Sequence, residues 1–161
     1  MDLRFEAVPQ QIVDFCENVR LKHFVHLDGA RVMYVFDTKK TMKSGRVTFA
    51  RIKKTSDELK YLSMNDDGTT YDYIMTFDKL LWDGFEEIDR KRLIYHEFCH
   101  CEVDFDKANP YCIKDHEIQG FYDEMIYNAD DPRWVERLSV LADALYDPEN
   151  EAPAPTDEED V

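Results

Sequence analysis

The sequence lacks several features that would place the protein in a membrane or outside the cell. No apolar run approaches the roughly 20 residues that a membrane-spanning helix needs. The first residues, MDLRFEAVPQ, contain no basic region followed by an apolar stretch, so we expect no secretory signal. None of the four cysteines forms a CxxC pair: Cys16, Cys99, Cys101 and Cys112. We therefore expect reduced thiols and a cytoplasmic protein without a membrane partner.

Basic residues are scarce, with 20 Lys and Arg against 35 Asp and Glu and a formal net charge of −15. Such an acidic chain repels nucleic acid on average. From Asp147 onward the chain contains no Lys or Arg and is rich in proline and acids, which predicts a disordered acidic tail over 147–161. The remaining residues, 1–146, have the length of a single domain that can bury its own core.

The apolar pattern predicts helices and strands in an α+β order. The expected elements are an N-terminal helix over Val8–His23, strands over Arg31–Phe36, Gly45–Lys54 and Tyr71–Phe77, a helix from about Glu86 to Cys101 or Val103, a helix over His116–Tyr127 and a last helix opening at Asp131-Pro132. We expect a small three-stranded sheet in which the first two strands are neighbours or a hairpin.

The expected helix from about Glu86 to Cys101 or Val103 carries candidate chemistry. His96-Glu97-Phe98-Cys99-His100 is an H-E-x-x-H motif inside a predicted helix. Because a helix has 3.6 residues per turn, residues four apart share one face, so both imidazoles can bind one ion. Glu97 lies about 100° around the helix, within reach of a water on that ion. The motif therefore predicts a zinc site in which Glu97 is the catalytic general base.

Two histidines do not complete a catalytic zinc site, which needs a third protein ligand. His116 is the preferred candidate, because it follows His100 after a loop long enough to return. If Asp115 caps a helix, His116 lies in its first turn, where the positive end of the helix disfavours imidazolium. Glu117 and Glu124 stay open as alternative ligands, since some zinc peptidases use a downstream glutamate.

These segments together resemble the phage metallopeptidase family and, more distantly, the SprT-like and Spartan-type zinc proteases. The matching stretches are the alternating strand at Gly45–Lys54, YDYIMTFDKLLW at 71–82, DRKRLIYHEFCHCEVD at 89–104, and DHEIQGF at 115–121. The resemblance covers about residues 30–125 and is strongest around the H-E-x-x-H motif.

The resemblance implies a zincin-like metallopeptidase domain over 1–146. It implies zinc held by His96, His100 and His116, with Glu97 as general base and a protein or peptide as substrate. For a phage-encoded protein, it implies the cytoplasm of the host cell. The alternative function is that of an acidic accessory or inhibitor protein of phage type, which acts by protein binding and keeps a structural or vestigial metal site.

A basic segment interrupts the acidic chain. Residues 39–54 contain seven Lys and Arg and no acid. Such a segment is a candidate contact for nucleic acid or an acidic partner. The alternative is a hairpin whose lysines prevent edge-to-edge pairing and bind the protein's own acids.

The remaining candidates concern the substrate and the thiols. We expect the Tyr71–Phe77 strand to lie beside the metal helix, where it would pair with an extended substrate. Trp82 is expected to anchor that strand to the metal helix. The tyrosines near the motif are open candidates for stabilising an oxyanion: Tyr95, Tyr111 and Tyr122. Cys99 and Cys101 are expected to pack rather than bind metal, and Cys112 has no assigned role.

Overall fold

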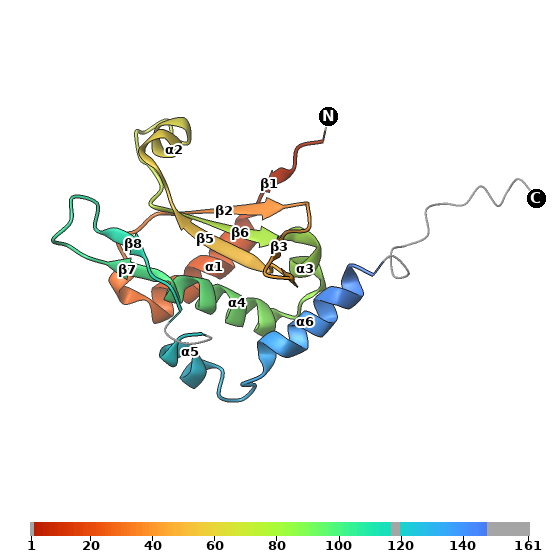
Figure 1. The fold of residues 1–161 in the computed structure, drawn as a ribbon. Helices are drawn as coiled ribbons and strands as arrows, with labels where there is room; N and C mark the ends of the chain where they lie inside the picture. The colour runs from red at the N-terminus through yellow and green to blue at the C-terminus, as the bar shows by residue number, and fades with distance from the viewer. Residues whose placement is uncertain (1, 117–119, 148–161) are drawn as a thin grey trace, which may run out of the picture.

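The computed structural model describes residues 2–116 and 120–147, and all structural statements concern these residues (Figure 1). In chain order the elements are β1 (Phe5–Ala7), α1 (Gln10–His23), the 3₁₀ helix η1 (Val25–Leu27), β2 (Val32–Asp37), β3 (Met42–Lys43), β4 (Arg46–Val47), β5 (Ala50–Lys54), α2 (Asp57–Leu62), β6 (Tyr73–Asp78), α3 (Lys79–Gly84), α4 (Glu87–Cys99), β7 (Cys101–Val103), β8 (Tyr111–Ile113), α5 (Tyr122–Tyr127) and α6 (Trp134–Leu145).

The main sheet has four strands in the order β1-β2-β6-β5. β2 and β6 pair in parallel, whereas β1 and β5 run antiparallel to their neighbours. Two smaller antiparallel ladders, β3–β4 and β7–β8, lie outside it. The helices α1 and α4 lie against this sheet, and α6 flanks it toward the C-terminal end of the described chain (Figure 1). The α+β class expected from the element order is confirmed.

β6 lies inside the sheet and is covered on both faces, one of which is formed by Tyr73, Met75 and Phe77. All six are buried, and Tyr73, Met75 and Phe77 are fully covered. The expected pairing of the first two long strands is therefore wrong, since β6 lies between β2 and β5. The expectation that Tyr71–Phe77 pairs with a substrate is also wrong, because β6 uses both edges within the sheet. The edge strand beside α4 is β5.

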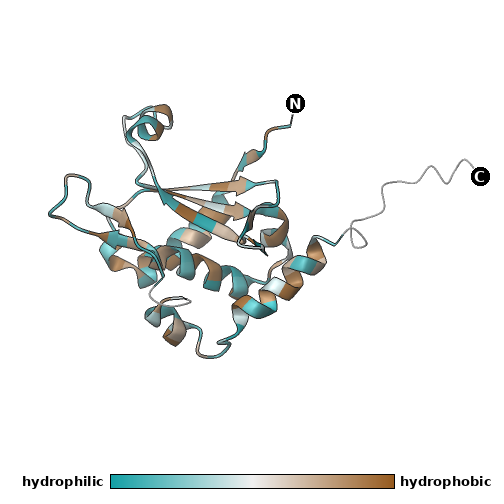
Figure 2. Ribbon diagram, viewed as in Figure 1, coloured by the Kyte–Doolittle hydropathy of each residue, from teal (hydrophilic) through white to brown (hydrophobic). Residues whose placement is uncertain are grey.

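The core joins the sheet to the helices. Apolar residues gather in the strands of the main sheet and along α6 (Figure 2). Trp82 of α3 is buried, with its ring centroid 4.5 Å from that of Phe77. The Arg90 Nε of α4 donates to the Trp82 carbonyl oxygen. Trp82 therefore links β6 to α4, the helix that carries the H-E-x-x-H motif, as the sequence predicts.

The apolar pattern of the sequence misses several short helices and strands. It does not predict β1, α2, α3 or the β7–β8 ladder, and it treats 45–54 as one strand. The chain instead makes a tight hairpin at Ser44 and Gly45, whose φ angles are 53° and 77°, and enters the sheet only at Ala50. The positive φ angles suit a two-residue turn between short antiparallel strands.

No helix within residues 2–116 and 120–147 is long and apolar enough to span a bilayer. The predicted tail lies outside the described residues except for Asp147. The division into a domain over 1–146 and a tail stays a prediction.

Candidate metal centre

Helix α4 places the H-E-x-x-H motif at its C-terminal end. Glu87 and Asp89 in its first turn suit the positive end of the helix dipole. Leu93, Ile94 and Phe98 are almost fully buried and fix its orientation under the sheet. His100 caps the helix with φ −71° and ψ −17°, still in the helical region, so the i, i+4 relation to His96 is preserved.

The β7–β8 ladder returns the chain to this helix end. The pairing of Cys101 with Ile113 places Lys114 opposite His100, and the Lys114 N–H donates to the His100 carbonyl at 2.7 Å. His116 follows in a segment without regular structure. The expected helix over His116–Tyr127 is therefore wrong at His116, Gly120 and Phe121, since α5 begins at Tyr122. The dipole of α5 does not act on His116.

The three histidines converge on one point. Their candidate ligand atoms all lie within 4.8 Å of one another, so the group could hold a metal ion. His96 Nε2 lies 3.1 Å from His116 Nε2. A tetrahedral zinc ion with bonds of about 2.0 Å separates its nitrogen ligands by roughly 3.3 Å, so this spacing fits zinc.

Hydrogen bonds at Nδ1 set the tautomers of two imidazoles. His100 Nδ1 lies 2.7 Å from the Lys114 carbonyl oxygen, which can only accept. His96 Nδ1 lies 2.9 Å from both carboxylate oxygens of Glu124. In its neutral form, each ring would donate from Nδ1 and carry its lone pair on Nε2. This is the arrangement that metal-binding histidines usually have.

Glu124 has a role that the sequence analysis did not assign. It is buried in α5, accepts from the Phe121 N–H at 2.9 Å, and contacts His96 rather than completing the histidine group. Gly120 makes room for this carboxylate, because a Cβ there would lie 2.5 Å from Glu124 Oε1. The other rival ligand, Glu117, lies outside the described residues.

Glu97 lies beside the histidines with little access to solvent. It is 5% exposed, and burial raises the pKa of its carboxyl group to about 7. The positive charge of Lys43, in the β3–β4 hairpin, acts in the opposite direction. Burial lowers the pKa of His100 and of His116, which favours the neutral rings that bind metal ions.

Aromatic side chains surround the imidazoles. The Phe121 ring centroid lies 4.8 to 5.6 Å from the ring centroids of all three histidines. Trp134, the first residue of α6, has its ring centroid 6.3 Å from that of His96. Phe121 and Trp134 are both buried, so they limit water around the rings. Neither was assigned a function from the sequence, because apolar residues at helix starts have many structural uses.

The remaining candidates are the tyrosines considered for oxyanion stabilisation and the cysteines. Tyr95 stacks on Tyr127 with centroids 4.0 Å apart, and Tyr111 packs edge-on against Tyr73. Tyr122 is exposed at the start of α5. Cys99 and Cys101 are buried, as packing residues would be, and Cys112 is half-buried.

The basic segment 39–54 makes contacts within the protein. Arg51 Nη2 lies 3.2 Å from Asp37 Oδ2, and Lys40 Nζ lies 5.1 Å from the centre of the Tyr146 ring. The Arg4 side chain also donates to Asp37, and these partners hold the pKa of that carboxyl well below its usual range. Contact with nucleic acid or an acidic partner stays a prediction.

Comparison with protein families gives one match. The model of a family described as "Putative phage metallopeptidase" matches residues 4–146. Comparison with curated proteins and with solved structures found no match. The more distant similarity to SprT-like proteases stays a prediction. The match extends over nearly all described residues and includes the three convergent histidines, so the chain belongs to the phage metallopeptidase family.

Proposed function

We propose that the protein is a zinc-dependent peptidase in which His96, His100 and His116 hold the metal. The observation that carries the proposal is the pair of Nδ1 hydrogen bonds, from His96 to Glu124 and from His100 to the Lys114 carbonyl. They direct two lone pairs toward the point that His116 Nε2 also approaches. A donor set of three neutral imidazoles suits zinc and leaves one position for water or substrate.

The residues around this point have separable roles. Zinc, when bound, lowers the pKa of water and polarises a carbonyl group. Glu97 takes a proton on its carboxylate and later passes it to the leaving amine. Its burial favours this exchange, because a carboxylate in a dry site holds a proton more readily than one in water. Glu124 keeps the His96 ring in one orientation and one tautomer.

The family indicates a protein or peptide as substrate. Of the two edge strands of the main sheet, β5 is the one that packs over α4, and an extended peptide could pair with it. A peptide bound there would lie beside Glu97 and the histidines, with its backbone held by hydrogen bonds. We propose that this cleavage takes place in the cytoplasm of a host cell.

Measuring the zinc content of the purified protein tests whether the three histidines bind a metal ion. We expect the purified protein to hold one zinc ion per chain, measured by mass spectrometry. The variant His116→Ala should lose zinc during dialysis against a weak chelator, because two imidazoles bind the ion less tightly than three. His26→Ala is the matched control, since His26 is exposed on η1. No bound metal in the parent after incubation with zinc would contradict the proposal and favour an accessory protein that acts by binding.

The contact between Glu124 and His96 gives a second expectation. Glu124→Gln should weaken zinc affinity about 10- to 100-fold, because loss of a charged partner lowers the basicity of the ligand and loosens its ring. Competition with a fluorescent chelator measures the affinity. Asp123→Asn, an exposed change on the same helix, should leave affinity at the parent value. Equal affinities for all three proteins would show that Glu124 does not position His96.

A further inference from the structure

A groove of about 280 Å³ lies between the β3–β4 hairpin and α6. One wall comes from the hairpin and the residues that follow it, and the other from one face of α6. Arg46, Val47 and Phe49 line the hairpin wall, and Ser139, Ala142 and Asp143 line the α6 wall. On α6 the residues Val135, Ser139 and Ala142 recur at helical spacing, so the groove follows the helix for about two turns.

The α6 wall begins beside the metal centre. Trp134 is the first residue of α6 and its ring lies close to that of His96. The next residue, Val135, lines the groove. One end of the groove therefore lies one residue along α6 from the contact between Trp134 and His96.

The hairpin wall begins beside the same centre. Lys43 pairs across the ladder with Arg46, which lines the groove. The positive charge of Lys43 acts on both Glu97 and His116, so this end of the hairpin lies within electrostatic reach of them. Both walls thus begin near the candidate metal centre. A pocket for a substrate residue next to the cleaved bond is expected in this position.

The lining chemistry indicates what the groove accepts. Val47 and Phe49 are half-buried and Ala142 is fully buried, which makes an apolar floor. Arg46 stands exposed on the hairpin wall, and Glu136 and Asp143 stand exposed on the α6 wall, so the rim carries both signs of charge. An apolar floor under a mixed polar rim suits an uncharged side chain that leaves water on binding.

We propose that this groove is a specificity subsite that takes a large apolar side chain of the peptide, next to the bond that is cleaved. The inference rests on the proposed peptidase function and adds its substrate preference. It makes the β3–β4 hairpin and α6 the elements that select the substrate.

Binding of hydroxamates to the zinc-loaded protein tests the subsite without requiring turnover. Two peptide hydroxamates that differ only in one side chain, isobutyl or methyl, are compared by calorimetry, with acetohydroxamate as the probe of the metal alone. The parent should bind the isobutyl compound about tenfold or more tightly than the methyl one, because extra buried methylene groups strengthen binding. Ser139→Trp fills the groove and should reduce the preference to within about twofold.

Val140→Trp is the matched control, because Val140 is 72% exposed on the same helix and does not line the groove. It should keep the preference of the parent, and acetohydroxamate should bind all three proteins equally. Equal binding of the two peptide hydroxamates by the parent, or a preference that survives in Ser139→Trp, would overturn the subsite. If the parent prefers the isobutyl hydroxamate but cleaves no peptide, the subsite is supported and the peptidase function is contradicted. Failure of acetohydroxamate to bind the zinc-loaded parent would overturn both.

Discussion

Glu97→Gln is expected to keep the zinc content of the parent and to lose nearly all peptide cleavage. Glutamine has almost the same shape, so packing under the sheet should change little, but its amide cannot take up a proton. General acid–base catalysis contributes about 10²- to 10⁴-fold to rates, and we expect a loss of this size in kcat. Cleavage of a fluorogenic peptide library, combined with metal analysis of the same samples, measures both properties.

The control for this change lies on the same helix. Glu87 is an exposed acid in the first turn of α4, so Glu87→Gln should cleave at the parent rate. Cleavage by Glu97→Gln at that same rate would eliminate Glu97 as the general base. Loss of zinc from Glu97→Gln, with the fold intact by circular dichroism, would instead assign Glu97 to the structure of the metal centre.

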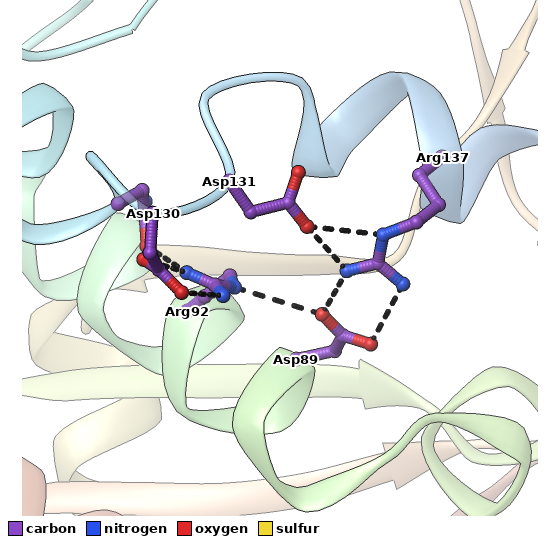
Figure 3. A network of polar contacts seen from close by, with 6 residues as sticks. Asp89, Arg92, Asp130, Asp131 and Arg137 are labelled. Carbon is purple, nitrogen blue, oxygen red and sulfur yellow. Dashed lines mark hydrogen bonds and ion pairs between the residues drawn. The ribbon is translucent and has the colours of Figure 1, made fainter.

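Of the substitutions described, Arg92→Met is expected to lower the free energy of unfolding the most. Arg92 is 4% exposed and links α4 to the segment between α5 and α6 (Figure 3). Its Nη2 lies 2.7 Å from Asp130 Oδ2 and its Nη1 donates to Asn128 Oδ1 at 3.2 Å. Asp89, which is buried, lies 3.7 Å from the Arg92 Nε and also accepts from Arg137.

Methionine fills the space of Arg92 but leaves Asp130 and the buried Asn128 and Asp89 with fewer partners. Removing one member of a buried charged network typically costs about 3–5 kcal/mol. Since Asp130 is largely exposed and can return to water, we expect the lower end, about 3 kcal/mol, in urea unfolding followed by circular dichroism.

Arg133→Met is the matched control, because it removes the same charge from an exposed position instead of a buried one. The Arg133 side chain is 82% exposed and pairs with Glu136 near the start of α6. Exposed pairs contribute about 1 kcal/mol or less, so this variant should unfold close to the parent midpoint. If the two variants lose equal stability, the buried network does not hold α4 against α5 and α6. A larger loss for Arg92→Met with zinc than without it would further show that the network supports the metal centre.

The sequence by itself determined the features that depend on neighbours along the chain. The spacing of His96 and His100 specified a shared helix face, because the helical period is local, and the apolar stripe of α6 specified its buried side. The alternation in 45–54 was only partly informative. It did not reveal the tight turn that removes Arg46 and Val47 from the main sheet and makes them a wall of the groove.

Tertiary structure alone decided the strand order and the surroundings of the histidines. The position of β6 between β2 and β5 depends on pairing between distant segments, which apolar pattern does not encode. Likewise the β7–β8 register brings the Lys114 carbonyl to His100, and packing of α5 brings Glu124 to His96. The chemistry of the ligands could be predicted because residue types and short spacings define it. Their orientation could not, because it is fixed by hydrogen bonds to groups 14 and 28 residues away.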